Sequence, residues 1–244
     1  MEERVSYTEE NRKWIGARLE EGLSLLRGHY SVKEQPSDPA LADPVIGGRP
    51  HRARRYDIEG LGNLLVMTAA ESEENQLSSF VIMPYTKNLP MLSADYVYNG
   101  ENRFMLLEIY DLSVFHDAVY DAGIKAFGDF AEKMEGMQDI PPRPGWYDGI
   151  RPVCCVKAFG RDQDERSVQY FKEFLEIFID MAEKSPALTG DDLRRKWEIN
   201  RDYADRLIDE GGVSTDLFTK ALGAENTRRF FHEVFFGTAH YRPV

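Results

Sequence analysis

LPMLSADYVYNGENRFMLLEIYDLS, residues 89–113, is the most informative segment of this chain. Residues 93–98 and 104–110 are two runs of aromatic and aliphatic side chains. Asn99-Gly100 between them is typical of a hairpin turn, because both residues tolerate positive φ. The second run is largely apolar, which indicates a strand covered on both faces of its sheet. The segment therefore predicts a β-hairpin within a buried sheet.

Asp95 is the carboxylate in the first of these two runs, among aromatic and aliphatic neighbours. Because side chains alternate along a strand, Asp95 is expected to face the same side as Val97 and the opposite side from Tyr96 and Tyr98. Two interpretations are open at this point. Asp95 is either an exposed aspartate near a strand end, or a pocket carboxyl whose pKa is raised by burial.

The remaining chain predicts an antiparallel sheet with helices on its faces. Strands are expected at residues 54–59, 64–70, 78–84 and 151–159 in addition to the hairpin, and five of the six follow one another as in a meander. Apolar side chains at helical spacing and N-cap or glycine signals predict helices at 9–30, 113–135, 166–184, 189–209, 214–222 and 225–236. Residues 31–50 are expected to form a loop. No linker or repeat divides the sequence, so residues 1–244 are expected to form a single domain.

The composition argues against several classes of function. The net charge of −12 disfavours general nucleic-acid binding. Cys154 and Cys155 are adjacent and the five histidines are scattered, so no metal site is expected. A polar N-terminus and the lack of an apolar run of about 18 residues predict a cytoplasmic protein without a membrane segment. There is no P-loop, no dinucleotide-binding glycine motif after a strand, no GxSxG and no HExxH.

Several strings of the chain, in their order, resemble the ferredoxin-dependent bilin reductases, which reduce linear tetrapyrroles such as biliverdin. Red chlorophyll catabolite reductase is a plant relative that shares their fold. The resemblance extends from about residue 53 to about residue 237 and has no single diagnostic signature. It rests on Leu89-Pro90-Met91-Leu92, Ala94-Asp95, Tyr110-Asp111-Leu112-Ser113, Pro141-Pro142, Trp146, Lys220-Ala221-Leu222-Gly223 and Glu233-Val234-Phe235-Phe236.

The resemblance implies a three-layer α/β/α sandwich with a central antiparallel sheet and the bilin between the sheet and the C-terminal helices. It also implies a monomer that binds no flavin, nicotinamide or metal and takes electrons one at a time from reduced ferredoxin. Asp95 matches the family's central proton donor. The chemistry suits an aspartate, because a carboxyl in an apolar pocket can hold a proton near neutral pH and donate it.

The departures from the family concern the other pocket residues. Ser79 stands where some members have a histidine, and Met67 falls near the position of a glutamate. That pair serves vinyl-group reduction, so a four-electron reduction of the phycocyanobilin type is not expected. A second family aspartate aligns near Gly212, and Asp209 or Asp216 are its candidate substitutes. The alternative for Asp209 is an exposed acid at a helix end.

Basic residues have two candidate roles. The family arginine that meets the bilin propionates falls at Gln138, so Arg143 is the candidate replacement, with a surface role as its alternative; Lys220 is a further candidate for substrate binding. A reduced ferredoxin is acidic like this chain, so it would dock on a local basic patch. The patch candidates are Arg52, Arg54 and Arg55, or Lys220, Arg228 and Arg229.

Three functions are compatible with the sequence. The first is the ferredoxin-dependent reduction of biliverdin or a related bilin. The second is a bilin-binding or chaperone-like relative without reductase activity, and the third is a reductase of another linear tetrapyrrole such as a chlorophyll catabolite.

Overall fold

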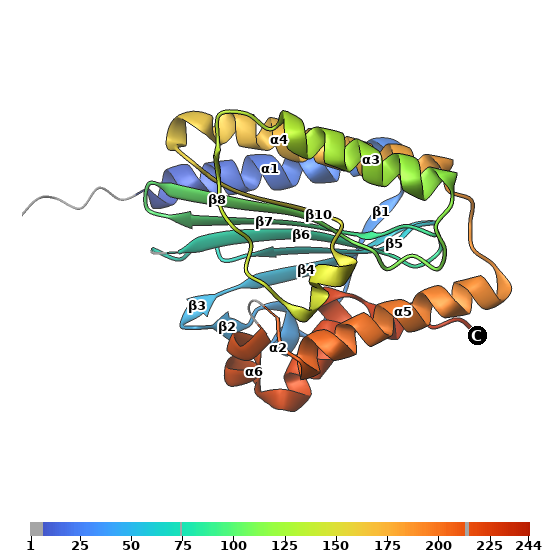
Figure 1. Ribbon diagram of the computed structural model, residues 1–244. Coiled ribbons are helices and arrows are strands. Elements are labelled where there is room, and N and C mark those ends of the chain that lie inside the picture. Colours follow the sequence, from blue (N-terminus) through green and yellow to red (C-terminus); the bar gives the residue numbers. More distant parts are fainter. Residues whose placement is uncertain (1–6, 74, 213–214) are drawn as a thin grey trace, which may run out of the picture.

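The computed structural model describes residues 7–73, 75–212 and 215–244 (Figure 1). Its centre is a sheet of eight strands in the order β1-β4-β5-β6-β7-β8-β10-β9, and all neighbouring strands are antiparallel. The strands are β1 Val32–Gln35, β4 Arg52–Ile58, β5 Gly62–Thr68, β6 Gln76–Pro84, β7 Met91–Asn99, β8 Asn102–Tyr110, β9 Gln138–Asp139 and β10 Val153–Phe159. A separate two-stranded ribbon consists of β2 Val45–Ile46 and β3 Arg49–Pro50.

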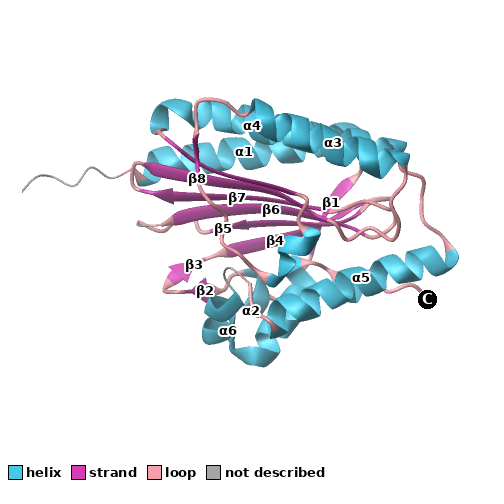
Figure 2. Cartoon of the chain, viewed as in Figure 1, coloured by secondary structure: helices cyan, strands magenta, loops and turns pink. Residues whose placement is uncertain are grey.

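Helices cover both faces of the sheet (Figures 1 and 2). One layer contains α1 Thr8–His29, α3 Ala118–Lys133 and α4 Asp164–Lys184. The other contains α2 Pro39–Ala42, α5 Gly190–Asp209, α6 Thr215–Arg229 and the π-helical turn η3 Phe230–Phe235. Short 3-10 turns are η1 Trp146–Ile150, η2 Arg161–Gln163 and η4 Thr238–His240. A hydrophobic core lies on each face of the sheet, so the predicted three-layer α/β/α sandwich is confirmed.

The predicted hairpin is β7–β8, but its turn lies one residue further along the chain. Asn99 pairs with Asn102, so the two-residue loop is Gly100-Glu101. Gly100 has φ = 61°, and no described residue other than glycine has positive φ. A type II′ turn has glycine at its first loop position, followed by a residue with negative φ, and Gly100-Glu101 fits this pattern. Asn99 is therefore the last residue of the strand and does not have to adopt positive φ.

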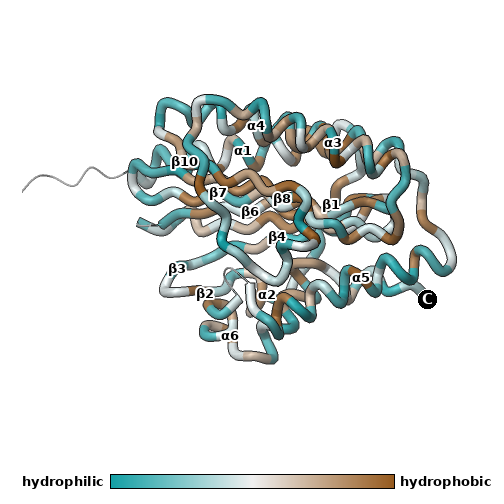
Figure 3. The backbone as a smooth tube through the Cα atoms, viewed as in Figure 1, coloured by the Kyte–Doolittle hydropathy of each residue, from teal (hydrophilic) through white to brown (hydrophobic). Residues whose placement is uncertain are grey.

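The predicted alternation along β7 is confirmed. Tyr96 and Tyr98 are buried against α1 and α4, where the Arg18 guanidinium lies 3.4 Å from the centre of the Tyr96 ring and donates a 2.8 Å hydrogen bond to the Tyr98 hydroxyl. Asp95 faces the opposite layer. Hydrophobic residues are concentrated in the central strands, and the helices show hydrophilic residues outward (Figure 3). The five-strand meander β4 to β8 is likewise confirmed.

Two regions differ from the sequence prediction, and one further predicted boundary falls where the structure describes no residues. Residues 31–50 are not a plain loop: they contain β1, whose short polar sequence VKEQ pairs with β4, and the β2–β3 ribbon. Helix α3 begins at Ala118 rather than at residue 113, because the Asp117 carboxylate accepts a 2.8 Å hydrogen bond from the Tyr120 amide and caps it there. The predicted start at Ser214 of a C-terminal helix lies outside the described residues.

Candidate active site

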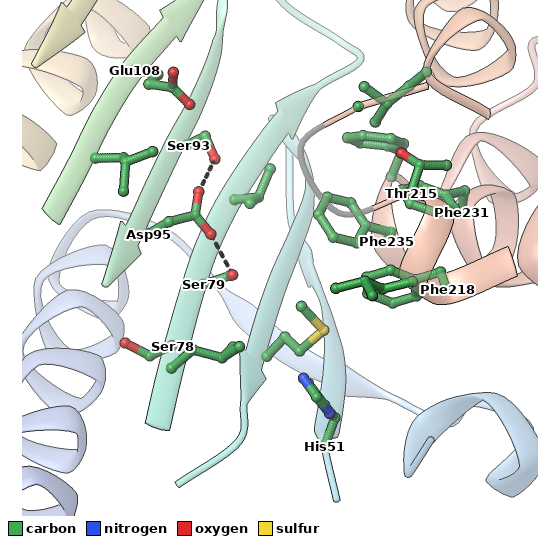
Figure 4. A pocket seen from close by; sticks show the side chains of 18 of the residues that line it. His51, Ser78, Ser79, Ser93, Asp95, Glu108, Thr215, Phe218, Phe231 and Phe235 are labelled. Atoms are coloured by element: carbon green, nitrogen blue, oxygen red, sulfur yellow. Dashed lines mark hydrogen bonds between the residues drawn. The ribbon is translucent and has the colours of Figure 1, made fainter. Parts of the chain in front are cut away.

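A cavity of about 280 Å³ lies between the sheet and the C-terminal helical layer (Figure 4). Its floor is formed by β5, β6, β7 and β8, and α5, α6 and η3 close it from the other side. Aromatic side chains are prominent in its lining. They are Tyr110 on the sheet side and, from the other elements, Tyr147, Tyr203, Phe218, Phe231, Phe235 and Phe236. Flat apolar walls of this kind suit a flat conjugated ligand, which stacks on aromatic rings and loses its contact with water.

A row of paired residues crosses the floor of the cavity. Met67 on β5 pairs with Ser79 on β6, Ser79 pairs with Asp95 on β7, and Asp95 pairs with Leu106 on β8. Paired residues on adjacent strands share a face, so all four side chains point into the cavity. The structure therefore brings together Asp95, Ser79 and Met67, three of the residues selected from the sequence. Their roles remain predictions.

Two serine hydroxyls hold the Asp95 carboxyl in place. Ser79 donates a short hydrogen bond to one oxygen, and Ser93 donates a 2.8 Å hydrogen bond to the other (Figure 4). Burial raises the pKa of Asp95 to about 6; the two serines oppose the rise and the nearby Glu108 adds to it. Of the two interpretations that the sequence left open for Asp95, the pocket carboxyl is therefore the correct one. A substantial fraction of this group carries a proton just below neutral pH.

A second carboxylate, Glu108, lines the same cavity and was not selected from the sequence. It is buried on β8, where its oxygens accept a 2.7 Å hydrogen bond from Arg151 and a 3.1 Å hydrogen bond from the Tyr110 hydroxyl. Ser93 is its partner across the β7–β8 pair. The signal was present in the sequence: a glutamate in the apolar run FMLLEIY, two positions from Leu106 and therefore on its face.

Two basic residues line the cavity at the β2–β3 end. Arg49 is half-buried, and His51 is buried immediately before β4. The Nδ1 atom of His51 lies 2.8 Å from the Arg49 carbonyl oxygen, to which it donates. Burial lowers the pKa of His51, so the ring is neutral at neutral pH and Arg49 supplies the positive charge at this end. Arg49 comes from the segment predicted to be a loop. His51 begins the basic stretch 51–55, for which the sequence left open a solvated strand start or an anion-binding role.

The other selected residues lie apart from the cavity. Asp209 is exposed at the end of α5, and its carboxylate accepts a 2.6 Å hydrogen bond from Arg228. Asp216, Arg143 and Lys220 are exposed as well and do not line the cavity. Gly212, which matches the second family aspartate, does line it but has no side chain. Among the described residues that line the cavity, Asp95 and Glu108 are the only carboxylates.

The proposed basic docking patches need correction in the same way. Arg55 is 6% exposed on β4, so it cannot belong to a surface patch. Arg54 pairs with Asp43 at 2.9 Å, and Arg229 pairs with Glu233 at 2.9 Å. Neighbouring carboxylates therefore balance Arg54 in the first predicted cluster and both Arg228 and Arg229 in the second. Arg52 and Lys220 are the exposed members for which the structure gives no ion pair among the described residues.

The described residues contain neither a cluster of metal ligands nor a membrane-spanning helix. No group of three or more histidine, cysteine, aspartate or glutamate side chains is placed to hold a metal ion. None of the described helices is long and apolar enough to cross a membrane.

The resemblance to the bilin reductases implies an antiparallel sheet between two helical layers, with the ligand site under the C-terminal layer. The structure has this fold, and its aromatic cavity under the C-terminal layer contains the acid Asp95. The protein is similar in structure to phytochromobilin synthase from tomato, solved in complex with biliverdin. The TM-score is 0.70 over 93% of this chain and 84% of that chain, at 12% sequence identity. This likeness confirms the fold. No protein-family model and no curated protein sequence matches the chain.

Proposed function

We propose that this protein is a ferredoxin-dependent reductase of a linear tetrapyrrole, biliverdin or a related bilin. The observation that carries the proposal is Asp95, a carboxyl with a raised pKa on the floor of an aromatic cavity. The fold it shares with a phytochromobilin synthase that was solved with biliverdin supports the same substrate class.

The proposed chemistry combines protons from the pocket with electrons from outside. Each step adds one proton and one electron to the tetrapyrrole, and two such steps hydrogenate one double bond while two reduced ferredoxins are oxidised. Asp95 donates a proton from its neutral form and is left as a carboxylate, which Ser79 and Ser93 stabilise through their hydrogen bonds. Asp95 then takes up a proton from solvent and donates it in the second step. The protonated tetrapyrrole accepts an electron more readily than the neutral one. In this proposal the protein binds no redox cofactor of its own.

One experiment separates the candidate functions. Purified protein is mixed with biliverdin, and a red-shifted, sharpened absorbance band reports binding. Reduced ferredoxin is then regenerated anaerobically by its reductase and NADPH. Loss of the biliverdin band with formation of a reduced bilin supports the proposal. Binding without turnover would instead indicate a bilin-binding protein or a reductase of another linear tetrapyrrole, and lack of binding would overturn the proposed substrate class.

Arg49 provides a prediction about how the ligand is oriented. A bilin carries two propionates, and Arg49 is the positive charge at one end of the cavity. Arg49→Gln is therefore expected to raise the Kd for biliverdin about tenfold, the loss of one charge-assisted hydrogen bond. Biliverdin dimethyl ester, which lacks the carboxylates, should bind both forms equally. Absorbance titration measures both constants.

Arg143→Gln is the comparison, because Arg143 is the exposed arginine that the sequence suggested for the same task. It should leave both Kd values unchanged. If Arg143→Gln weakens biliverdin binding and Arg49→Gln does not, the propionates lie at the other end of the site.

A further inference from the structure

Glu108 and Arg151 form a buried ion pair beside the proposed proton donor. The two side chains are 8% and 7% exposed, and their atoms lie 2.7 Å apart. Arg151 follows η1 and also donates a 2.6 Å hydrogen bond to Asp148, so its guanidinium has a fixed position. A buried pair of this kind is costly to desolvate and is poor evidence of a stabilising role by itself. Its position next to the cavity suggests that it has another role.

The register places Glu108 diagonally across from Asp95. Ser93 pairs with Glu108, and Asp95, two residues further along β7, pairs with Leu106. Diagonal neighbours of this type are about 7–8 Å apart. Ser93 lies between the two acids, since it pairs with Glu108 and its hydroxyl donates to Asp95 (Figure 4). Two carboxylates on one sheet face, separated by a serine, interact strongly through a medium from which water is largely excluded.

The two acids have different partners. Asp95 has only neutral hydroxyls as hydrogen-bond partners, whereas Glu108 has a guanidinium. Carboxyl pairs whose environments differ in this way divide the roles of acid and anion between them. We propose that Glu108, ion-paired with Arg151, is a positioning residue that keeps the proton on Asp95. The meaning of this pair for catalysis rests on the proposed function, whereas its electrostatic effect on Asp95 does not.

The other groups around Asp95 do not supply this charge. From the C-terminal layer the titratable group facing the cavity is Tyr203, whose pKa burial raises strongly, so it is neutral. Burial likewise raises the pKa of the Cys154 thiol, which lies 3.4 Å from Glu108, to about 12. Among the described residues, the other titratable or charged groups at the cavity are Arg49, His51, Tyr110 and Tyr147, together with Tyr96, whose ring points into the opposite layer. Glu108 is therefore the negative charge that acts on Asp95.

Nuclear magnetic resonance titration of the ligand-free protein tests this directly. Aspartate labelled with ¹³C at Cγ reports the pKa of each carboxyl, and the signal absent in Asp95→Asn identifies Asp95. Glu108→Gln removes the negative charge and leaves Arg151 paired only with the more exposed Asp148, so the pKa of Asp95 should fall by about one unit. Arg151→Gln leaves the charge of Glu108 unbalanced, so the pKa should rise.

The opposite signs exclude a merely structural role, because general loosening of the site would move both variants in one direction. Glu176→Gln, an exposed acid on α4 across the sheet, is the control and should not shift the signal. Should either single variant fail to fold, the double variant Glu108→Gln/Arg151→Gln replaces it, because this variant removes both members of the buried pair. Its Asp95 pKa should be slightly below that of wild type and above that of Glu108→Gln.

The result that would overturn the inference is an Asp95 pKa that is the same in wild type, Glu108→Gln and Arg151→Gln, or that moves in the same direction in both. Since no bilin or ferredoxin is present, this outcome is independent of whether the protein reduces a bilin. Conversely, opposed shifts together with a failure to bind biliverdin would leave the ion pair's effect intact and refute the proposed function.

Discussion

Replacing Asp95 by asparagine is expected to lower bilin turnover by at least about 100-fold, the usual scale for a lost general acid. Asparagine keeps the size of the side chain and can still hydrogen-bond to Ser79 and Ser93, but it has no acidic proton to donate. Biliverdin should still bind, because most of the affinity comes from burying a large flat ligand among aromatic rings. Anaerobic single-turnover spectra measure the loss, and a one-electron reduced bilin should accumulate as a signal in electron paramagnetic resonance.

The wild-type rate should depend on pH in a defined direction. Only the neutral form of Asp95 donates a proton, so with a pKa of about 6 the rate of the first protonation should be highest in acid and fall as the pH rises through that value. Asp209→Asn is the comparison, since Asp209 is exposed and paired with Arg228, and both its turnover and its pH profile should match wild type. Wild-type turnover in Asp95→Asn would make the aspartate structural.

The parts of the site that the sequence predicted depend on local pattern. Alternation along β7 determines the face of Asp95, and the meander of short strands determines that β5, β6 and β7 are neighbours. Met67, Ser79 and Asp95 come together through this simple topology. The predicted turn, Asn99-Gly100, differs by one residue from the observed loop, Gly100-Glu101. The predicted face of Asp95 is nevertheless correct, because the buried face of the strands determines their register.

The parts that were not predicted depend on contacts between distant segments. Asp209 was a candidate because it lies near the right place in the sequence, but the packing of α5 on the sheet turns it to solvent and turns Tyr203 toward the cavity. Arg49 reaches the site through a ribbon within a segment that resembles a loop, and His51 follows that ribbon directly. The sequence does not indicate a role for Glu108, because a single acid in an apolar run does not reveal its partner. That partner, Arg151, is distant in the sequence and meets Glu108 only in the folded protein.

The second large effect concerns stability and lies on the opposite face of the hairpin. Arg103 at the start of β8 and Asp164 at the start of α4 are 0% and 1% exposed and form an ion pair at 3.2 Å. The same guanidinium donates 2.7 Å hydrogen bonds to Asn11 on α1 and to the Gly100 carbonyl in the turn. Arg103→Met should lower the free energy of unfolding by about 3–5 kcal/mol, because it leaves the Asp164 charge buried without a partner.

The pH dependence of this loss identifies its cause. Burial raises the pKa of Asp164 and Arg103 opposes the rise, so the variant should have a still higher pKa at this position. Its stability deficit should be largest at neutral pH, where Asp164 is charged in both folded proteins. The deficit should narrow as the pH falls through the raised pKa of Asp164 in the variant, because the folded variant then holds a neutral carboxyl that needs no partner. Chemical denaturation at several pH values measures this stability deficit.

Adding Asp164→Asn to Arg103→Met should recover part of the lost stability, since an amide has no charge to bury. Breaking the exposed pair of Lys125 and Asp129 by Lys125→Met should have no measurable effect on stability. A deficit in Arg103→Met that is independent of pH would show that the arginine contributes through packing and its hydrogen bonds to Asn11 and the turn, and that its charge is not what holds α1, α4 and the hairpin together.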